Sequence, residues 1–162
     1  MATLDPNQIN NTYLEPILAH RFLMSIDGIP QALIKSVDGI GFDDGEVIVN
    51  HINTYYKTRA KRVWNDISLN LYNFVSPGTY GAIYEWSRLG YELATGRAGY
   101  FDFYAKDVTM QIIDPPGNIM AEWLFEKCFP KTFGAGAYDW ASNEHTLTNL
   151  VLANSGQELL FG

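Results

Sequence analysis

Residues 106–153 constrain the fold of this chain more than any other stretch, because polar and apolar side chains alternate there on both sides of a strong turn signal. The alternation over residues 106–113 has the two-residue period of a strand with one buried face. The sequence DPPGN at residues 114–118 favours chain reversal, because proline fixes φ while Gly and Asn accept a positive φ. Alternation resumes over residues 119–126. We therefore predict an antiparallel β-hairpin followed, after a glycine-rich segment, by a closing strand.

Further strands are expected at residues 20–27, 33–37, 46–56 and 63–75, from their alternation and composition. The last two predict a long β-hairpin over about residues 46–75. A domain of 162 residues cannot cover such a ribbon along its whole length. Because a two-stranded ribbon is marginally stable in water and free strand edges invite pairing, we expect a neighbouring molecule to cover its distal half.

One helix is predicted over about residues 79–95. Thr79 can cap its N-terminus, and Thr95-Gly96 ends it. Its apolar side chains recur three and four residues apart and so share one face: Tyr80, Ile83, Trp86, Leu89 and Leu93. The polar side chains of Glu85, Arg88 and Glu92 are expected to face water. With the strands, this predicts a mainly β fold, an antiparallel β-barrel or sandwich with one helix and one long protruding hairpin.

Length and composition agree with a single domain over residues 1–162, in which residues 1–17 form an N-terminal arm. The 14 glycines and seven prolines suit a turn-rich β protein. No apolar run approaches the roughly 18 residues that a membrane span needs, so we expect no membrane insertion. The first residues lack the basic and apolar regions of a secretory signal.

The net charge of −7 is unevenly distributed along the chain. Lys57, Arg59, Lys61 and Arg62 lie within six positions, and without them seven basic residues oppose eighteen acidic ones, a balance of −11. Such a body repels nucleic acid, whose binding depends on cations that neutralise phosphates. The hairpin prediction places this basic cluster at the tip. The tip is either merely solvated or a contact element that reaches an acidic surface of another subunit, and a nucleic-acid or membrane patch is a third alternative.

No catalytic, cofactor or metal site is indicated, so we do not expect an enzyme. The three histidines, His20, His51 and His145, lack zinc-site spacing and are expected to be ordinary polar residues on strands. Residues 39–45 lack the glycine spacing of a phosphate loop and predict a turn or bulge. Residues 43–46 predict an exposed acidic turn. The single cysteine, Cys128, is expected to be a small buried residue in an apolar strand.

The order of these elements resembles that of the tail tube proteins of contractile-tailed bacteriophages. In that family a hairpin of the pattern DVTI.LLDE.GN....W.L.NA.PT is followed by an Asn-Glu pair and a final apolar strand. The corresponding residues here are Asp107-Val108-Thr109-Met110, Asp114, Gly117-Asn118, Trp123, Cys128, Pro130-Lys131 and Asn143-Glu144. The segment FL..IDG......K.VDGIGF, which begins at Phe22, is similar to the N-terminal strand pair of the family. One departure is Pro115-Pro116, which tightens the turn.

The resemblance implies a structural virion protein without cofactors. It implies that six copies form a ring, that rings stack into the inner tube of a contractile tail, and that the tube conducts DNA during ejection. The implied partners are other copies of the chain, the tail sheath protein, the baseplate tube initiator and the tail terminator. DNA and the tape measure protein would pass through the lumen without specific binding. The expected location is the virion tail, assembled in the host bacterial cytoplasm.

Contacts between subunits are expected at the basic cluster and at the aromatic residues beside it, Tyr55, Tyr56 and Trp64. Two alternatives stay open at this point. One is the inner tube of a related injection machine, which would carry protein effectors instead of DNA. The other is a small β-barrel that binds a ligand or flavin with its aromatic side chains.

Overall fold

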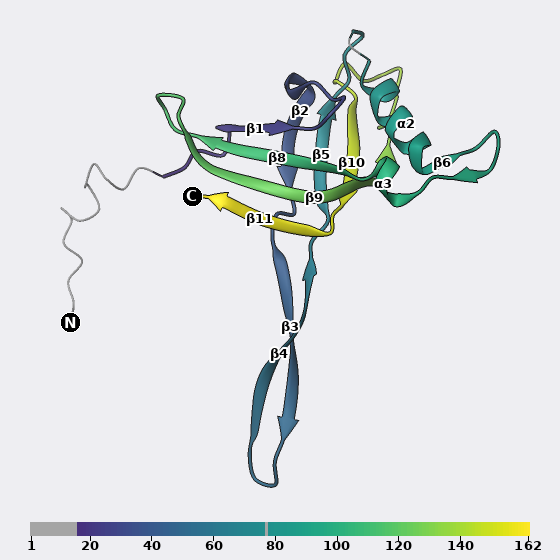
Figure 1. Cartoon of the computed structure of the whole chain (residues 1–162). Helices are drawn as coiled ribbons and strands as arrows, with labels where there is room; N and C mark the ends of the chain where they lie inside the picture. The colour runs from purple at the N-terminus through teal and green to yellow at the C-terminus, as the bar shows by residue number, and fades with distance from the viewer. Residues whose placement is uncertain (1–15, 77) are drawn as a thin grey trace.

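The computed structural model describes residues 16–76 and 78–162, so the expected N-terminal arm lies almost entirely outside the described residues. The described chain is mainly β, as predicted, with antiparallel strands in a sandwich-like body and one main helix at its side (Figure 1). The described strands do not close into a barrel, so the sandwich is the arrangement that is confirmed.

One layer of the body consists of four antiparallel strands in the order β1, β8, β9 and β11. Their bounds are β1 (Phe22–Ser25), β8 (Lys106–Ile113), β9 (Ile119–Gly134) and β11 (Gly156–Phe161). β8 and β9 form the predicted hairpin. Its turn is closed by Asp114, whose Oδ1 accepts hydrogen bonds from the backbone N–H groups of Gly117 at 2.8 Å and Asn118 at 2.7 Å. Gly117 has the positive φ, 99°, that the turn signal predicts.

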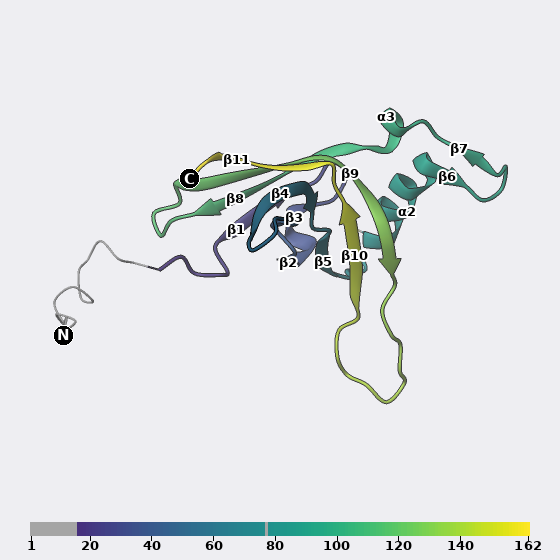
Figure 2. The ribbon, with the colours of Figure 1, turned by 90° about the horizontal axis from the view of Figure 1, so that it is seen from below.

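The second layer contains the far half of β9, β10 (Leu147–Ala153), β5 (Ile67–Tyr72) and β2 (Ile34–Asp38), in that order. A short 3-10 helix, η1 (Gln31–Leu33), precedes β2. Figure 1 shows β2, β5 and β10 crossing the strands of the first layer, and Figure 2 shows β11 lying along β9. β10 is the predicted closing strand, whereas β11 was not predicted.

β9 joins the two layers because it bends at Lys127. Lys106 pairs with Cys128 and Val108 with Phe125, so Asp107 faces two residues of β9, which is a β-bulge. Lys127 has a φ of 49°, and its backbone N–H donates to Asp107 Oδ1 at 2.9 Å. The side chain of Asp107 therefore stabilises the bend that lets a single strand belong to both sheets.

The core fills the space between the layers and beneath the helix. Its buried apolar side chains are Met24, Ile26, Ile29, Leu33, Ile67, Leu69, Leu71, Ile83, Trp86, Val108, Met110, Phe125, Cys128, Leu150 and Leu152. The predicted alternation is confirmed for β8, where Val108 and Met110 point inward. Cys128 is fully buried as expected, and this burial raises the pKa of its thiol to about 12.

The helix α2 (Thr79–Gly90) is shorter than predicted. Its N-cap is Gly78, while the hydroxyl of Thr79 donates to the carbonyl of Tyr72. Ile83 and Trp86 are buried, but Leu89 and Leu93 are exposed. The helix ends early because β6 (Tyr91–Glu92) and β7 (Arg97–Ala98) form a small hairpin, before a single-turn helix α3 (Phe101–Tyr104). No helix in the described part of the chain is long and apolar enough to cross a membrane.

The protruding hairpin is formed by β3 (Phe42–Asn50) and β4 (Tyr55–Trp64), and it extends away from both layers (Figure 1). Inside the body β2 pairs with β5, with Asp38 opposite Ser68, and the same register resumes outside with Phe42 opposite Trp64. One long ribbon therefore leaves the sheet, and its outer half is a two-stranded sheet of its own. The strand predicted over residues 63–75 is thus divided between the hairpin and the body.

Candidate interaction surface

The structure moves the basic cluster away from the hairpin tip. The turn comprises residues 51–54, whereas Lys57, Arg59, Lys61 and Arg62 lie along β4. The predicted position was wrong because β4 continues through the cluster. Basic side chains are tolerated on this strand because the opposing strand carries acidic ones, and opposite charges across a strand pair attract.

Ion pairs across the hairpin hold three of the four cations. Arg62 donates from Nε and Nη2 to the two carboxylate oxygens of Asp44, at 2.6 and 2.7 Å. Arg59 lies 3.7 Å from the same carboxylate, and Lys57 Nζ lies 2.8 Å from Glu46 Oε1. The hydrogen bond from Arg62 lowers the pKa of Asp44, and the same bond raises the pKa of Arg62.

Aromatic rings lie on the same face of the hairpin, near its base. The guanidinium of Arg62 lies 3.6 Å from the ring centroid of Phe42 and 5.4 Å from that of Trp64. The two rings meet edge to face, with centroids 5.7 Å apart. A guanidinium held by a bidentate carboxylate and two rings has little freedom, so this part of the hairpin is rigid. The charge of Arg62 is mostly satisfied by contacts within the hairpin.

The charge expected at the tip is therefore largely neutralised within the hairpin. Residues 42–64 carry four basic and three acidic side chains, a net charge of +1, which leaves −8 for the rest of the chain. The fold therefore does not place a charge of +4 at the tip of the hairpin opposite a body of −11. Electrostatic attraction of the whole hairpin for an acidic partner is correspondingly weaker than the sequence suggested.

The opposite face of the hairpin is mostly apolar and largely exposed. Opposing residues of paired strands share a face, so the pairing places Val47, Val49, Tyr56 and Val63 together on the face without ion pairs. Asp43, opposite Val63, and Thr58, opposite Val47, are its polar members. Val47 is 50% exposed, Tyr56 51% and Val63 62%. At the turn, Ile52 is fully exposed, and His51 stacks on Tyr56 with ring centroids 5.5 Å apart. We call Val47, Val49, Tyr56 and Val63 the apolar face, and the turn at residues 51–54 the tip.

The seven residues predicted as contacts are thus divided. Tyr55, Lys57, Arg59, Arg62 and Trp64 lie on the charged face, and Tyr56 lies on the apolar face. Lys61 lies at a β-bulge, where it and Ala60 together oppose Gly45. Sequence reasoning missed Val47 and Val49, which the alternation of β3 would have revealed, and Ile52, which lies in the turn at residues 51–54.

The residues considered for chemistry do not come together. His20, His51 and His145 lie outside the strands, contrary to expectation, and in separate parts of the fold. The acidic residues 43–46 lie on β3 instead of in a turn, because Asp44 and Glu46 pair with β4. Among the described residues no group of His, Cys, Asp or Glu is arranged to hold a metal ion.

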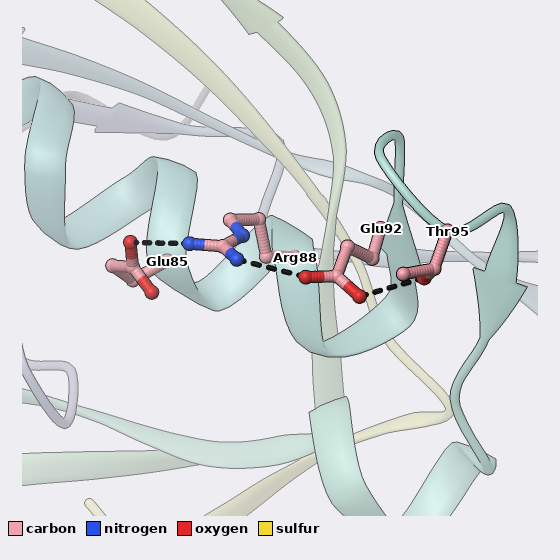
Figure 3. Close-up of polar contacts among 4 residues, drawn as sticks. All are labelled: Glu85, Arg88, Glu92 and Thr95. Atoms are coloured by element: carbon pink, nitrogen blue, oxygen red, sulfur yellow. Dashed lines mark hydrogen bonds and ion pairs between the residues drawn. The ribbon is translucent and has the colours of Figure 1, made fainter.

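A second exposed region lies at the end of α2. Arg88 donates to Glu85 at 3.1 Å and to Glu92 at 2.9 Å, and Thr95 donates to the other oxygen of Glu92 at 2.7 Å (Figure 3). The hydrogen bond from Thr95, followed by that from Arg88, lowers the pKa of Glu92. Glu85 and Arg88 are exposed as predicted, whereas Glu92 is half-buried. With Thr95 they form a connected chain that ties the helix to the β6–β7 hairpin.

The connection between β9 and β10 projects from the body (Figure 2). Tyr138 and Trp140 are exposed there, and the hydroxyl of Tyr80 on α2 bonds to the hydroxyl of Tyr138 and to the carbonyl of Ala135. The bond to Tyr80 raises the pKa of Tyr138. The helix thus holds the base of a loop whose aromatic end is uncovered.

No protein-family model matches the chain, and no curated protein matches it. Solved structures do. The cap that terminates the tube of the anti-feeding prophage (AFP) has a TM-score of 0.75 and 19% identity, covering 91% of this chain and 93% of its own. A chain of the sheath–tube complex of PVC, an extracellular contractile injection system, has a TM-score of 0.73 and 18% identity, covering 99% and 100%.

A more distant likeness is to Hcp1 from Flavobacterium johnsoniae, with a TM-score of 0.54 and 11% identity over 87% of this chain and 95% of that one. At these identities the likeness concerns the fold. The chain has the fold of the tube and cap proteins of contractile injection systems, which confirms the predicted resemblance at the level of fold. The first two are described as parts of tubes, a tube-terminating cap and a chain of a sheath–tube complex.

Proposed function

We propose that this chain is a structural subunit of the tube of a contractile tail. In this proposal six copies form a ring, rings stack inside a sheath, and the channel conducts DNA during ejection from a bacteriophage. The single observation that carries the proposal is the hairpin β3–β4, which protrudes from the body with its apolar face and tip uncovered. Its support is the likeness of the fold to tube and cap proteins.

The hairpin is the proposed contact between copies. An isolated two-stranded ribbon is marginally stable in water, and this one exposes Val47, Val63 and Ile52. A neighbouring copy that covers the apolar face would bury them. When each copy contacts the next through the same two different surfaces, the copies form a ring if the rotation between neighbours closes on itself. If the rotation does not close, they form a filament.

The apolar face would supply the buried area of this contact, and the exposed cations of the hairpin would set its orientation. Lys61 and Arg59 keep exposed cations on the hairpin, while the rest of the chain carries −8. Charge reversal of Lys57, Arg59, Lys61 and Arg62 together should impair assembly, because it removes the internal ion pairs and sets like charges against the partner. Unchanged assembly would exclude a role for the cluster without excluding the tube.

The partners of the proposed assembly are the sheath protein outside the tube, a baseplate protein that initiates it and a terminator that ends it. Similar structures come from a sheath–tube complex, a sheath/tube terminator and a baseplate. We place the assembled protein in the virion tail, built in the cytoplasm of the host bacterium. DNA and a tape measure protein would pass through without specific binding, because an acidic chain does not retain phosphates.

Negative-stain electron microscopy of the purified chain tests the proposal. We expect rings or tubes of constant diameter, formed spontaneously or on addition of the tube-initiating baseplate protein of the same system. Failure to form either, even with that protein as a seed, would refute the proposal. A monomer with a bound ligand would instead favour the ligand-binding barrel, an alternative that the open order of the described strands does not support.

A second candidate is the inner tube of an injection system that delivers proteins. The similarity to AFP and PVC components favours it. The two candidates differ in cargo. Particles purified with their native tubes should contain a DNA-filled head under the first proposal, and tubes that hold protein without a head under the second.

A further inference from the structure

The hairpin leaves the body through a narrow root formed by residues 39–41 and 65–66. The strands of the hairpin pair only with each other, so no neighbouring strand of the body sets its direction. At the root the N–H of Asn65 donates to the carbonyl of Gly41 at 3.1 Å. Gly39 has a φ of 89°, and a Cβ there would lie 2.2 Å from the carbonyl oxygen of Asp66. The backbones are therefore in close contact, and the root is where the ribbon could pivot.

One side chain of the body holds both strands of this root. Gln157 lies on β11 and is 7% exposed. Its Oε1 accepts the N–H of Gly41 at 2.8 Å, and its Nε2 donates to the carbonyl of Asn65 at 3.0 Å. The Nδ2 of Asn154 donates to the same carbonyl at 2.8 Å. A single planar amide thus connects the outgoing strand, the returning strand and the body.

The backbone that carries Gln157 is itself fixed. Gln157 pairs with Phe125 of β9, whose side chain is fully buried in the core. The amide therefore ties the root to a strand that is paired at this point with a core residue of β9. Chemistry makes the side chain hard to replace, since glutamate lacks the donor for Asn65 and leucine lacks both donor and acceptor.

We propose that Gln157 is a positioning residue that fixes the angle at which the hairpin leaves the body. This role belongs to the isolated chain and does not depend on the proposed tube. Without the amide the strands of the hairpin stay paired with each other, but the hairpin as a whole samples a wider range of directions.

The test measures that range directly in the full-length monomer. Spin labels are placed at Ile52→Cys on the tip and Tyr84→Cys on α2, both exposed positions, while the native Cys128 is fully buried and stays unlabelled. Pulsed electron resonance then gives the distribution of tip-to-body distances. We expect a narrow distribution in the parent and a distribution at least about twice as wide in Gln157→Leu and Gln157→Glu. The control Glu158→Gln, an exposed position on the same strand, should match the parent.

Superimposable distributions in the parent and both Gln157 variants would overturn the proposal. If a variant does not fold, as circular dichroism would reveal, amide exchange in the parent decides instead. The N–H of Gly41 is bonded to the Gln157 side chain, so it should exchange slowly. Exchange at the rate of an unprotected loop would equally overturn the proposal. Because both measurements use monomers, their outcome is separate from whether tubes form.

Discussion

At the scale of single residues, two glycines differ in how many constraints exclude a side chain. Gly28 and Gly39 have nearly equal positive φ values, 87° and 89°. A Cβ on Gly28 would meet nothing within 4 Å, whereas on Gly39 it would lie 2.2 Å from a backbone oxygen. The first residue needs glycine for its φ alone, and the second needs it for φ and for space.

We therefore expect Gly28→Ala to reduce the free energy of unfolding by about 1–2 kcal/mol, the cost of the left-handed region for an alanine. Gly39→Ala should cost clearly more, because the new methyl group would meet the carbonyl of Asp66, which directly precedes β5 and cannot move away without disturbing the pairing of Ile67 with β10. Urea denaturation of both variants measures the difference. Equal losses would mean that the root of the hairpin relaxes freely.

The Asp44–Arg62 pair gives a prediction about pH. The pKa of Asp44 is lower in the folded protein than in the unfolded chain. The contribution of the ion pair to folding stability is therefore fully present above the ordinary aspartate pKa of about 3.9, and it is lost as the pH falls through the lower folded value. The ¹⁵N and ¹H chemical shifts of the Arg62 Nε–H, followed by nuclear magnetic resonance, should stay constant down to about pH 3.9 and change below it, as protonation of Asp44 breaks the hydrogen bond. Arg59, whose Nε lies 3.7 Å from the carboxylate, is the internal control and should show a smaller change. A change of the Arg62 shifts well above pH 3.9 would contradict the assignment.

At the scale of elements, the hairpin has two faces with different tasks. On the charged face, acidic and basic side chains form ion pairs with each other across the two strands, whereas the apolar face is exposed and available to a partner. Adjacent residues allow a matched comparison, since Val47 and Ile48 are each 50% exposed but point to opposite faces.

Under the proposed function, Val47→Ser should raise the protein concentration needed for assembly by about fivefold or more, as the loss of about 1 kcal/mol of apolar burial predicts. Ile48→Ser should change it less, and neither should alter the thermal stability of the monomer. Sedimentation of tubes over a concentration series measures both effects. A larger effect of Ile48→Ser would assign the contact to the charged face.

The sequence predicted the strands that have a strong period and a strong turn. Val108 and Met110 alternate with polar residues, and the proline pair before Gly117 marks a reversal, so β8 and the first half of β9 were placed correctly. β9 continues beyond the predicted end, to Gly134. The tip was misplaced because the turn at residues 51–54 has no glycine or proline, while the basic cluster looked like a loop. Gly45, which looked like part of a turn, instead opposes a bulge.

Other errors came from tertiary contacts that no local pattern contains. Leu89 and Leu93 continue the apolar period of α2, but the chain turns into β6 and leaves them exposed. β11 is short and follows a predicted end of the fold, and its polar Gln157 is buried because it meets the root of the hairpin. Residues that act across the fold, such as Gln157 and Asp107, could be found only from the structure.

At the scale of the whole molecule, the charge of −7 opposes any contact between copies. Screening lengths fall from about 30 Å at 0.01 M salt to about 3 Å at 1 M. If the apolar face dominates the contact, added salt should promote assembly, because it screens repulsion and leaves apolar burial intact. Turbidity or sedimentation across a salt series measures this. Assembly that weakens with salt would instead indicate that attraction between the basic strand and an acidic surface dominates.

The continuous ribbon described for β2–β5 and β3–β4 has a mechanical consequence. β4 runs directly into β5, which is hydrogen-bonded on both sides, to β2 and to β10. A pull along the hairpin would load β2 and β5 lengthwise together, because both belong to the same ribbon. The hydrogen bonds between β5 and β10 would then carry the force in shear and must fail together instead of one after another. A force applied at the tip would therefore be transmitted along the ribbon into the centre of the sheet, and not to a loop at its surface.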